Sequence, residues 1–254
     1  PADRDRLARH AVLMAVGGFG RREMAPHSDI DLMLLYDRQA AGPVVGAAKR
    51  LLQDLFNAGA EVGQSVRTMS ETCRLAAADA TILSSLLECR PLAGNAELAA
   101  RLTARLGRML ERAPRRHALA IVAARLEERA KYGDSVALLE PNVKRSPGGL
   151  RDVQLVRWLG RVLHGESSPD TLMRAGRLSR ADADTLRDAQ EFLTRLRNDL
   201  HLAAGKATER LPLSTFVNRR FLVLAMTSFT IYMVAQGGAF ESLFPVHARE
   251  AGGA

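Results

Sequence analysis

The sequence contains few of the residues that typify secreted or disulfide-bonded proteins. Of its 254 residues only Cys73 and Cys89 are cysteine, and they have neither zinc-type spacing nor the pattern of a disulfide framework. The charged opening, P-A-D-R-D-R, excludes an N-terminal signal peptide. We therefore expect reduced thiols and a cytoplasmic protein, and the absence of an initiating methionine indicates that the sequence begins within a longer one.

Aromatic residues are also scarce, at 5% of the chain, and they do not alternate with basic residues in the way that a single-strand binder requires. Lysine occurs only four times, so arginine supplies most of the 36 basic side chains, against 28 acidic ones. The net charge of +8 suits phosphate-bearing or acidic partners, but arginines scattered among acids are typical of solvated helix faces. We expect no nucleic-acid partner.

The composition is that of an ordinary globular protein, 47% hydrophobic and 25% charged, and the length suits one large domain or two modest ones. Three short segments have the apolar runs or the alternation of strands, namely residues 11–16, 29–36 and 61–68. Helical spacing occupies residues 44–58 and nearly all of residues 70–211. We predict an α+β protein with a small mixed-sheet domain in residues 1–90, a helical-bundle domain in residues 91–211 and an atypical hydrophobic tail in residues 212–254.

The most informative segment begins with a glycine pair. Gly17 and Gly18 end an apolar run, and ten residues later Asp29 and Asp31 alternate with aliphatic residues at the start of another run. Residues two apart on an extended strand point to the same face, so both carboxylates should project together. The aliphatic residues that alternate with them and should enter a core are Ile30, Leu32 and Leu34.

This spacing predicts a particular chemistry. Two neighbouring carboxylates repel each other unless a cation lies between them. Mg²⁺ takes oxygen ligands of this kind and shares them with substrate phosphates. A glycine turn nearby can offer backbone N–H groups to a triphosphate. The motif therefore indicates metal-assisted nucleotidyl transfer, and the alternative is that Asp29 and Asp31 are solvated carboxylates at a strand edge.

The glycine pair, the ten-residue spacer and the D-x-D pattern resemble the DNA polymerase β-like nucleotidyltransferase superfamily. The fuller string G-G-F-G-R-R-E-M-A-P-H-S-D-I-D-L resembles one branch of it, the PII-protein uridylyltransferase/uridylyl-removing enzymes. Three later segments are similar to the same branch and follow in its order: residues 61–68, 139–152 and 197–202. The likeness covers about residues 11–211.

The resemblance implies a polymerase β-like domain followed by a helical uridylyltransferase-associated domain. It also implies transfer of UMP from UTP to a tyrosine of a PII nitrogen-regulatory protein, with release of pyrophosphate. By this likeness the site residues in the first part of the chain are Gly17 and Gly18 for the triphosphate, Ser28 for a phosphate oxygen, Asp29 and Asp31 for two Mg²⁺ ions, Glu61 as a third metal carboxylate and Arg67 for the substrate.

A second group of site residues falls in the segment 139–152. The resemblance suggests a loop that closes over the nucleotide, with Lys144, Arg145 and Arg151 near phosphate and Gly148 and Gly149 forming its turn. The alternative is that the two glycines simply cap the following helix. Asp152 is interpreted as an acid near the start of that helix, where it favours the helix dipole.

The sequence departs from the family at two points. Arg22 stands where a small residue, usually glycine, is common, so the turn before the aspartates is expected to be altered. Full-length members continue into a phosphohydrolase domain of the HD type and two ACT domains. These do not fit in 254 residues, so uridylyl removal and glutamine sensing are expected to be absent from this chain.

The family likeness stops near Leu211, and residues 221–240 carry no charge. A helix of that length would be about 30 Å long, enough to cross a bilayer. The sequence of this segment is similar to the first transmembrane helix of a major-facilitator transporter. A membrane span, which would give the chain a membrane partner, and a helix docked in the helical domain are both compatible with this pattern.

Other functions also remain open at this point. One alternative is an adenylyltransferase of the same superfamily, because the contacts that select the base cannot be placed from the sequence. Another is a truncated, non-catalytic fragment that keeps the fold as a binding module. A third is a membrane-anchored protein. The intact pair Asp29 and Asp31 favours a catalytic site, because a site without a catalytic function could lose two neighbouring carboxylates that repel each other.

Overall fold

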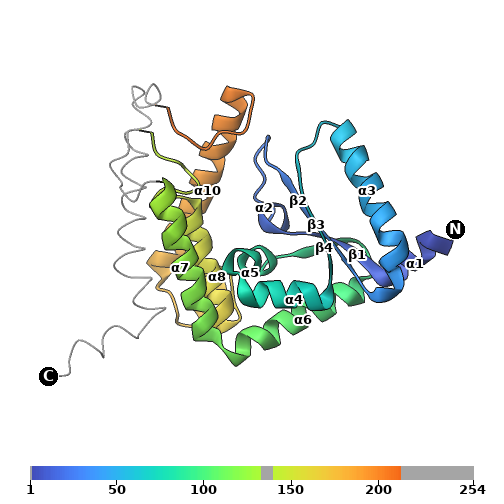
Figure 1. Ribbon diagram of the computed structural model, residues 1–254. Helices are drawn as coiled ribbons and strands as arrows, with labels where there is room; N and C mark the ends of the chain where they lie inside the picture. Colours follow the sequence, from blue (N-terminus) through green and yellow to red (C-terminus); the bar gives the residue numbers. More distant parts are fainter. Residues whose placement is uncertain (1, 133–139, 213–254) are drawn as a thin grey trace. The chain divides into compact units, whose positions relative to one another are not determined.

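The computed structural model describes residues 2–132 and 140–212, and it confirms the predicted α+β class (Figure 1). The chain divides into two compact units, Pro1–His117 and Ala118–Ala254. The division lies later in the chain than the boundary predicted near residue 90. The reason is that residues 90–112 form a strand and a helix that contact the first strand of the sheet, and so belong with the first unit.

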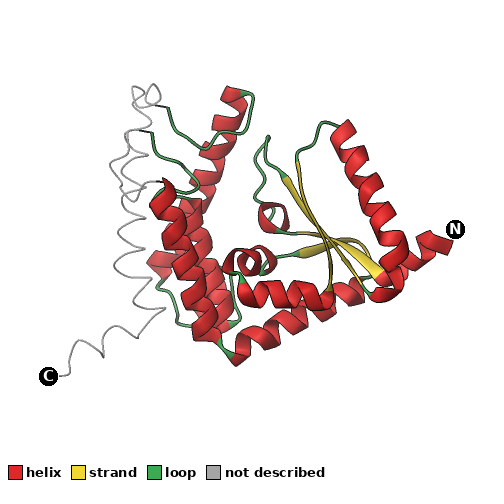
Figure 2. Cartoon of the chain, viewed as in Figure 1, coloured by secondary structure: helices red, strands yellow, loops and turns green. Residues whose placement is uncertain are grey.

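A four-stranded mixed sheet forms the centre of the first unit, in the order β3-β2-β1-β4. The strands are β1 (Ala11–Ala15), β2 (Ile30–Tyr36), β3 (Val62–Thr68) and β4 (Arg90–Gly94). β1 is antiparallel to β2 and to β4, whereas β2 and β3 are parallel. The parallel pair requires a crossover, which α3 (Ala41–Asn57) provides. Every named strand lies in this unit (Figure 2).

The three predicted strands are therefore present, and β4 was not predicted because Pro91 and Gly94 resemble helix breakers between two helical segments. β4 pairs only with β1 and forms an edge of the sheet. An edge strand tolerates proline because one row of its backbone groups has no sheet partner. Gly94 lies so close to β1 that a Cβ there would be 2.4 Å from the carbonyl oxygen of Ala11.

The remaining helices of the first unit surround the sheet. They are α1 (Ala2–His10), the short α2 (Gly17–Gly20), the 3-10 turn η1 (Arg38–Ala40), α4 (Met69–Ala78), α5 (Ala80–Leu86) and α6 (Ala96–Arg112). α3 lies on one side of the sheet, and α4 and α6 lie on the other (Figure 1). α4 begins with a capping box in which Thr68 and Glu71 exchange hydrogen bonds.

Burial on β2 differs in part from the sequence expectation. Leu32 is buried as predicted, but Ile30 and Leu34 are only half-buried. Met33 and Leu35, on the other face of the strand, are the most buried, at 1% and 0% exposure. The physical reason is that helices cover both faces of this sheet. The face of β2 that carries Asp31 also carries Met33 and Leu35, and these two side chains pack in the core under α4 and α6.

The described part of the second unit is helical apart from one isolated bridge between Asn142 and Arg210. Its helices are α7 (Pro114–Tyr132), α8 (Leu150–His164), α9 (Pro169–Arg174) and α10 (Arg180–Ala204). A cluster of aliphatic side chains joins α8, α9 and α10, including Val153, Leu172 and Leu193. α8 ends at Gly165, whose φ of +78° is the left-handed conformation that glycine adopts without strain.

No helix within residues 2–132 and 140–212 is both long enough and apolar enough to cross a bilayer. The predicted apolar segment 221–240 lies outside the described residues.

Candidate active site

A pocket of about 270 Å³ opens in the first unit at the carboxyl end of β1 and the start of β2. Its lining combines the first glycine of the pair, Gly17, with Asp31 and Arg67, which the sequence predicted as site residues. Gly63, Gln64 and Ser65 of β3 and Ser85 of α5 also line it. The structure thus brings three of the predicted residues together. Gly18, Ser28, Asp29 and Glu61 are not among the residues that line this pocket.

The carboxylate of Asp31 lies between two glycines from different elements. A Cβ added to Gly17 would stand 2.6 Å from Oδ2 of Asp31, and a Cβ added to Gly63 would stand 2.6 Å from Oδ1. A side chain at either position would therefore force the carboxylate of Asp31 to shift. Gly63 faces Asp31 because the two are register partners in the parallel pair β2–β3.

Gly17 is constrained twice, since its φ of +54° is also left-handed. The predicted Gly-Gly turn is a single helical turn, α2, which follows β1 directly. The N–H of Val16 donates to the carbonyl oxygen of Asp31 at 3.1 Å, and this bond extends the β1–β2 ladder to the pocket. The backbone at the glycine pair is therefore held against the strand that carries Asp31.

Side chains that the sequence did not single out brace this loop. Arg90 donates to the carbonyl oxygen of Phe19 at 3.3 Å and places its guanidinium 5.0 Å from the ring centroid. Arg21 is buried, at 4% exposure, and its Nε lies 2.9 Å from Glu23 and 4.0 Å from Glu88. No sequence signal could have identified Arg90 or Glu88, because both come from a distant segment that packs here only in the fold.

Arg22 follows this brace and has a φ of +62°, the only positive φ of a non-glycine among the described residues. Left-handed backbone costs an L-residue with a Cβ about 1–2 kcal/mol. This is a physical reason for a glycine at this position, which the resemblance led us to expect. Arginine adopts the left-handed conformation here at a cost in backbone strain.

The other predicted ligands lie around the start of β2. Asp29 is exposed and directly precedes the strand. Ser28 forms a turn with Ala25, in which its Oγ accepts the Ala25 N–H at 3.0 Å. Glu61 is exposed, and its carbonyl oxygen accepts the Ile30 N–H at 2.8 Å. These contacts set the register of β2 against β3.

The donor set around Asp31 fits a hard divalent cation. Mg²⁺ binds through one or two carboxylates and completes its shell with water and phosphate oxygens, so the carboxylate of Asp31 at the pocket is a suitable ligand. Within residues 2–132 and 140–212 no group of three histidine, cysteine, aspartate or glutamate side chains is arranged to hold a metal ion. The assignment of Glu61 as a third carboxylate therefore stays a prediction.

In the second unit, the described part of the signature segment folds into a tight turn before α8, which we call the signature turn (residues 142–149). Asn142 Oδ1 accepts the N–H groups of Lys144 at 3.1 Å and Arg145 at 2.8 Å. Ser146 Oγ accepts the Asn142 N–H at 2.9 Å. These side-chain bonds close the turn on itself, so the conformation around Lys144 is fixed locally.

The two glycines of the signature turn have structural tasks. Gly148 has a φ of +77°, and its N–H donates to Oδ2 of Asp152 at 2.7 Å. Gly149 is buried, donates to the carbonyl oxygen of Ser146 at 3.0 Å, and would place a Cβ 2.8 Å from the carbonyl oxygen of Val143. Both N–H groups are used inside the turn. The observed geometry matches the alternative in which the glycines shape the entry to α8.

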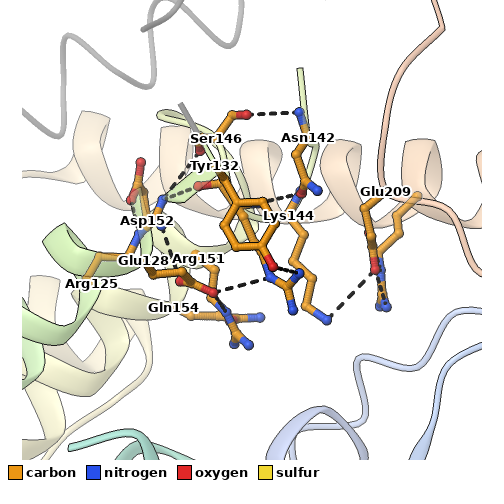
Figure 3. Close-up of polar contacts among 12 residues, drawn as sticks. Arg125, Glu128, Tyr132, Asn142, Lys144, Ser146, Arg151, Asp152, Gln154 and Glu209 are labelled. Atoms are coloured by element: carbon orange, nitrogen blue, oxygen red, sulfur yellow. Dashed lines mark hydrogen bonds and ion pairs between the residues drawn. The ribbon is translucent and has the colours of Figure 1, made fainter. Parts of the chain in front are cut away.

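Asp152 does more than favour the helix dipole. Its Oδ1 accepts a hydrogen bond from Nε of Arg125 on α7 at 2.8 Å, and the two side chains are only 10% and 3% exposed. Arg125 also donates to the carbonyl oxygen of Arg145 at 2.9 Å (Figure 3). Arg125 thus ties α7 to the middle of the signature turn and to the first turn of α8. Sequence reasoning missed it, because nothing in the local pattern distinguishes it from the solvated arginines of α7.

Lys144 is partly buried beside this brace, at 23% exposure, with Nζ 3.8 Å from Oε1 of Glu209. Burial, and after it the neighbouring guanidinium groups of Arg197 and Arg151, lower the pKa of Lys144 from 10.5 to about 8. Arg151 donates to Oε1 of Gln154 at 2.7 Å. The predicted residues Lys144 and Arg151 therefore belong to one cationic cluster, held by the turn and by α8.

Comparison with known proteins shows which family and which enzymes the chain is similar to. The family model described as GlnD PII-uridylyltransferase matches residues 116–231, which extends beyond Leu211, where the sequence likeness was expected to stop. The bifunctional uridylyltransferase/uridylyl-removing enzyme of Pseudomonas aeruginosa is 39% identical over 199 residues, 78% of this chain and 22% of the relative. The enzyme of the same name from Cereibacter sphaeroides is 40% identical over 215 residues, 83% of this chain and 22% of the relative.

A relative from Pseudomonas putida with the same name is 41% identical over 206 residues, 78% of this chain and 22% of the relative. The chain thus spans less than a quarter of the length of the curated relatives that it matches. Alignments that cover about four fifths of this chain at about 40% identity agree with the resemblance drawn from the motifs. Within residues 116–231 the chain is thus similar to the GlnD PII-uridylyltransferase family, and its similarity to the named enzymes covers about four fifths of its length.

Proposed function

We propose that the chain is the nucleotidyltransferase part of a uridylyltransferase, which transfers UMP from UTP to a tyrosine hydroxyl of a PII nitrogen-regulatory protein and releases pyrophosphate. The observation that supports this most directly is the carboxylate of Asp31, which lines a pocket between Gly17 and Gly63. A carboxylate packed between two glycines at a pocket is suited to fixing a cation against a phosphate chain. The similar proteins are uridylyltransferase/uridylyl-removing enzymes, which favours a uridylyl group as the group transferred.

In the proposed reaction the tyrosine oxygen attacks the α-phosphorus of UTP, and the bond to the bridging oxygen of pyrophosphate breaks. Asp29 and Asp31 would hold two Mg²⁺ ions at the start of β2. When bound, Mg²⁺ lowers the pKa of the attacking hydroxyl and neutralises charge on the leaving pyrophosphate. The backbone at Gly17 and Gly18 would orient the triphosphate, and Ser28 would hydrogen-bond a phosphate oxygen.

The pocket offers further groups for the substrate. Arg67 on β3 would pair with a phosphate oxygen, because a guanidinium forks onto two oxygens of one phosphate. Ser65 and Ser85 add hydroxyl groups, while Ile82 and Leu86 of α5 give the pocket an apolar wall. A site with one apolar wall and a few polar groups suits a nucleotide.

The test is to incubate the chain with UTP, Mg²⁺ and a purified PII protein, and to look for a mass increase of one UMP on the PII protein. Asp29→Asn combined with Asp31→Asn should reduce transfer by about 10³-fold or more, because the metal would lose its anchoring carboxylates. Asp54→Asn on α3 removes an exposed carboxylate from the same unit and should leave transfer unchanged.

Three outcomes would contradict the proposal. Retained label transfer in the double variant would refute the metal site. Transfer from ATP in place of UTP, in a panel of the four nucleoside triphosphates, would identify the adenylyltransferase alternative. Binding of the PII protein without transfer of any nucleotide would identify a binding module.

A further inference from the structure

The sheet of the first unit has two edge strands, and only one of them carries the usual protection against pairing with another chain. β4 has five residues, contains Pro91, and shifts register against β1 between Leu13 and Met14. Short length, proline and irregular register are common means of blocking an exposed edge. β3 has seven residues in continuous register with β2 and contains no proline. Among the described strands it pairs with β2 alone, so it has the regular backbone that an additional strand needs.

The register shows which backbone groups of β3 point away from β2. The N–H of Ile30 donates to the carbonyl oxygen of Glu61 at 2.8 Å, so the backbone of Glu61 faces β2. Alternate residues of a paired strand direct their backbone groups to opposite sides, so every second residue after Glu61 also faces β2. The residues between them form the outer row, which consists of Val62, Gln64 and Val66. This row carries no charge, Gln64 is exposed, and Val66 is 37% exposed.

This edge of the sheet adjoins the pocket. Gly63 of β3 is the register partner of Asp31, so the two residues lie side by side on one face of the sheet. Neighbouring strands are about 4.8 Å apart, so a strand added beside β3 would lie about 10 Å from β2. A tyrosine opposite Gly63 on that strand would extend its ring across β3 toward Asp31. Gly63 has no side chain in this path, and a glycine within a strand often marks the close approach of a ligand.

We propose that the edge of β3 binds the acceptor protein by strand addition. An extended segment of the acceptor pairs with the outer row, and its tyrosine crosses Gly63 to reach the carboxylate of Asp31. This inference rests on the proposed function, which supplies a tyrosine within a protein as the acceptor. Main-chain hydrogen bonds provide affinity in strand addition, and alternate side chains of the added strand meet the pocket face. β4 does not suit this role, because Pro91 has no N–H and no residue of β4 lines the pocket.

A proline in the outer row tests the pairing. Val66 belongs to this row and is not among the residues that line the pocket. Val66→Pro removes an outward N–H, and an edge strand tolerates proline at such a position. It should raise the KM for a purified PII protein in UMP transfer by about tenfold or more, with the KM for UTP unchanged. Val66→Thr is the matched control, because threonine keeps the N–H and the β-branched shape, and it should leave both KM values unchanged.

Hydrogen exchange tests the same edge without a substitution. In the free chain the N–H groups of Gln64 and Val66 should exchange faster than those of Gly63 and Ser65, which face β2. Addition of the PII protein without UTP should slow the exchange of Gln64 and Val66, and serum albumin at the same concentration should not. Equal slowing by serum albumin, or no slowing by the PII protein, would overturn strand addition.

The two variants and the exchange measurement also separate this inference from the proposed function. UMP transfer with the same KM for the PII protein in Val66→Pro and Val66→Thr would overturn strand addition and leave the proposed function standing. If Val66→Pro also weakens UTP binding in calorimetry, the proline has distorted β3, and the exchange of the unchanged chain decides. If the unchanged chain transfers no UMP, the proposed function fails, and slowed exchange of Gln64 and Val66 would still support the edge as a binding surface. Circular dichroism compares the folding of both variants.

Discussion

Two aspartates in this chain lie against glycines and yet differ in their surroundings. Asp31 in the first unit has its oxygens next to Gly17 and Gly63 and lines a pocket of about 270 Å³. Asp152 in the second unit accepts hydrogen bonds from Gly148 and Arg125 and is only 10% exposed. The same pairing of residue types therefore serves a site in one unit and a structural brace in the other.

The two carboxylates also differ in what lies beside them. Arg125 satisfies Asp152 from within the fold, so this aspartate holds α7, the signature turn and α8 together. At Asp31 the glycines remove side-chain bulk, and the carboxylate reaches a pocket large enough for substrate phosphates. A buried ion pair stabilises structure only when both partners are present, whereas a carboxylate at a pocket can bind an external cation.

The largest expected effect comes from breaking the brace. Arg125→Met should lower the free energy of unfolding by about 3–5 kcal/mol, because it leaves the buried carboxylate of Asp152 without its cation. Arg187→Met is the control, since Arg187 pairs with acids at 49% exposure and should contribute at most about 1 kcal/mol. Urea unfolding followed by circular dichroism measures both. Adding Asp152→Asn to Arg125→Met should recover part of the lost stability. Equal losses of stability in Arg125→Met and Arg187→Met would contradict a stabilising ion pair between Arg125 and Asp152.

The second effect concerns the position of Asp31. Gly63→Ala places a Cβ 2.6 Å from Oδ1 of Asp31, so the carboxylate must move. A shift of about 1 Å at such a site should reduce UMP transfer by about 10–100-fold. Gly46→Ala on α3 is the matched control, because nothing lies within 4 Å of its added Cβ. It should keep transfer and raise stability by about 0.5–1 kcal/mol. Equal transfer rates in the two variants would show that Gly63 does not position Asp31.

A smaller effect is expected at the turn that precedes Asp31. Arg22→Gly should raise the free energy of unfolding by about 1 kcal/mol, since glycine adopts the φ of +62° without strain. Arg50→Gly on the exposed part of α3 should have the opposite sign and cost about 1 kcal/mol, because glycine weakens a helix. Thermal unfolding compares the two. A loss of stability in Arg22→Gly would mean that the arginine side chain contributes more than its backbone strain costs.

The smallest expected effect concerns Lys144 in the cationic cluster. The pKa of Lys144 is lowered from 10.5 to about 8 in the folded chain. Between these two values the unfolded chain binds a proton that the folded chain has lost, so this group's contribution to stability rises with pH across that window. Below pH 8 both states are protonated and the folded state carries the full cost, to which the neighbouring Arg197, Arg151 and Arg145 contribute and which Glu209 reduces.

Lys144→Met should therefore stabilise the chain at pH 7, on the order of 1 kcal/mol after solvent screening, and by less at pH 10. Urea unfolding in phosphate-free buffer at both pH values measures the difference from the unchanged chain. Lys131→Met on α7, whose side chain is exposed, should show no such pH dependence. A destabilised Lys144→Met at pH 7 would mean that the ion pair with Glu209 outweighs the repulsion from the arginines.

Much of the fold could be predicted from local pattern. Apolar runs and alternation placed β1, β2 and β3, and helical spacing placed α3 and predicted the mostly helical residues 70–211. These elements could be predicted because each depends on a few neighbouring residues and on the period of one element. The glycine pair and the D-x-D pattern pointed to Gly17 and Asp31, which line the same pocket, and their role there stays a prediction. β4 was missed because its edge position, which tolerates Pro91, is a property of the sheet.

The partners of the site residues could not be predicted in the same way. Gly63 meets Asp31 through the register of β2 and β3, and Arg125 meets Asp152 through the packing of α7 on α8. Both pairs join segments 27 or more residues apart, and no local period links them. For the same reason the cationic surroundings of Lys144, which lower its pKa, depend on side chains from α8 and α10 and on Glu209 beyond them.

The sequence by itself determined which chemistry this protein can present: neighbouring aspartates after a glycine pair, and a lysine within a turn rich in glycine and arginine. Only the tertiary structure decided which carboxylate lines a pocket and which is neutralised by an arginine. The physical reason is that charge compensation depends on distances of 3 to 4 Å between side chains, and strand register and helix packing set those distances between remote segments.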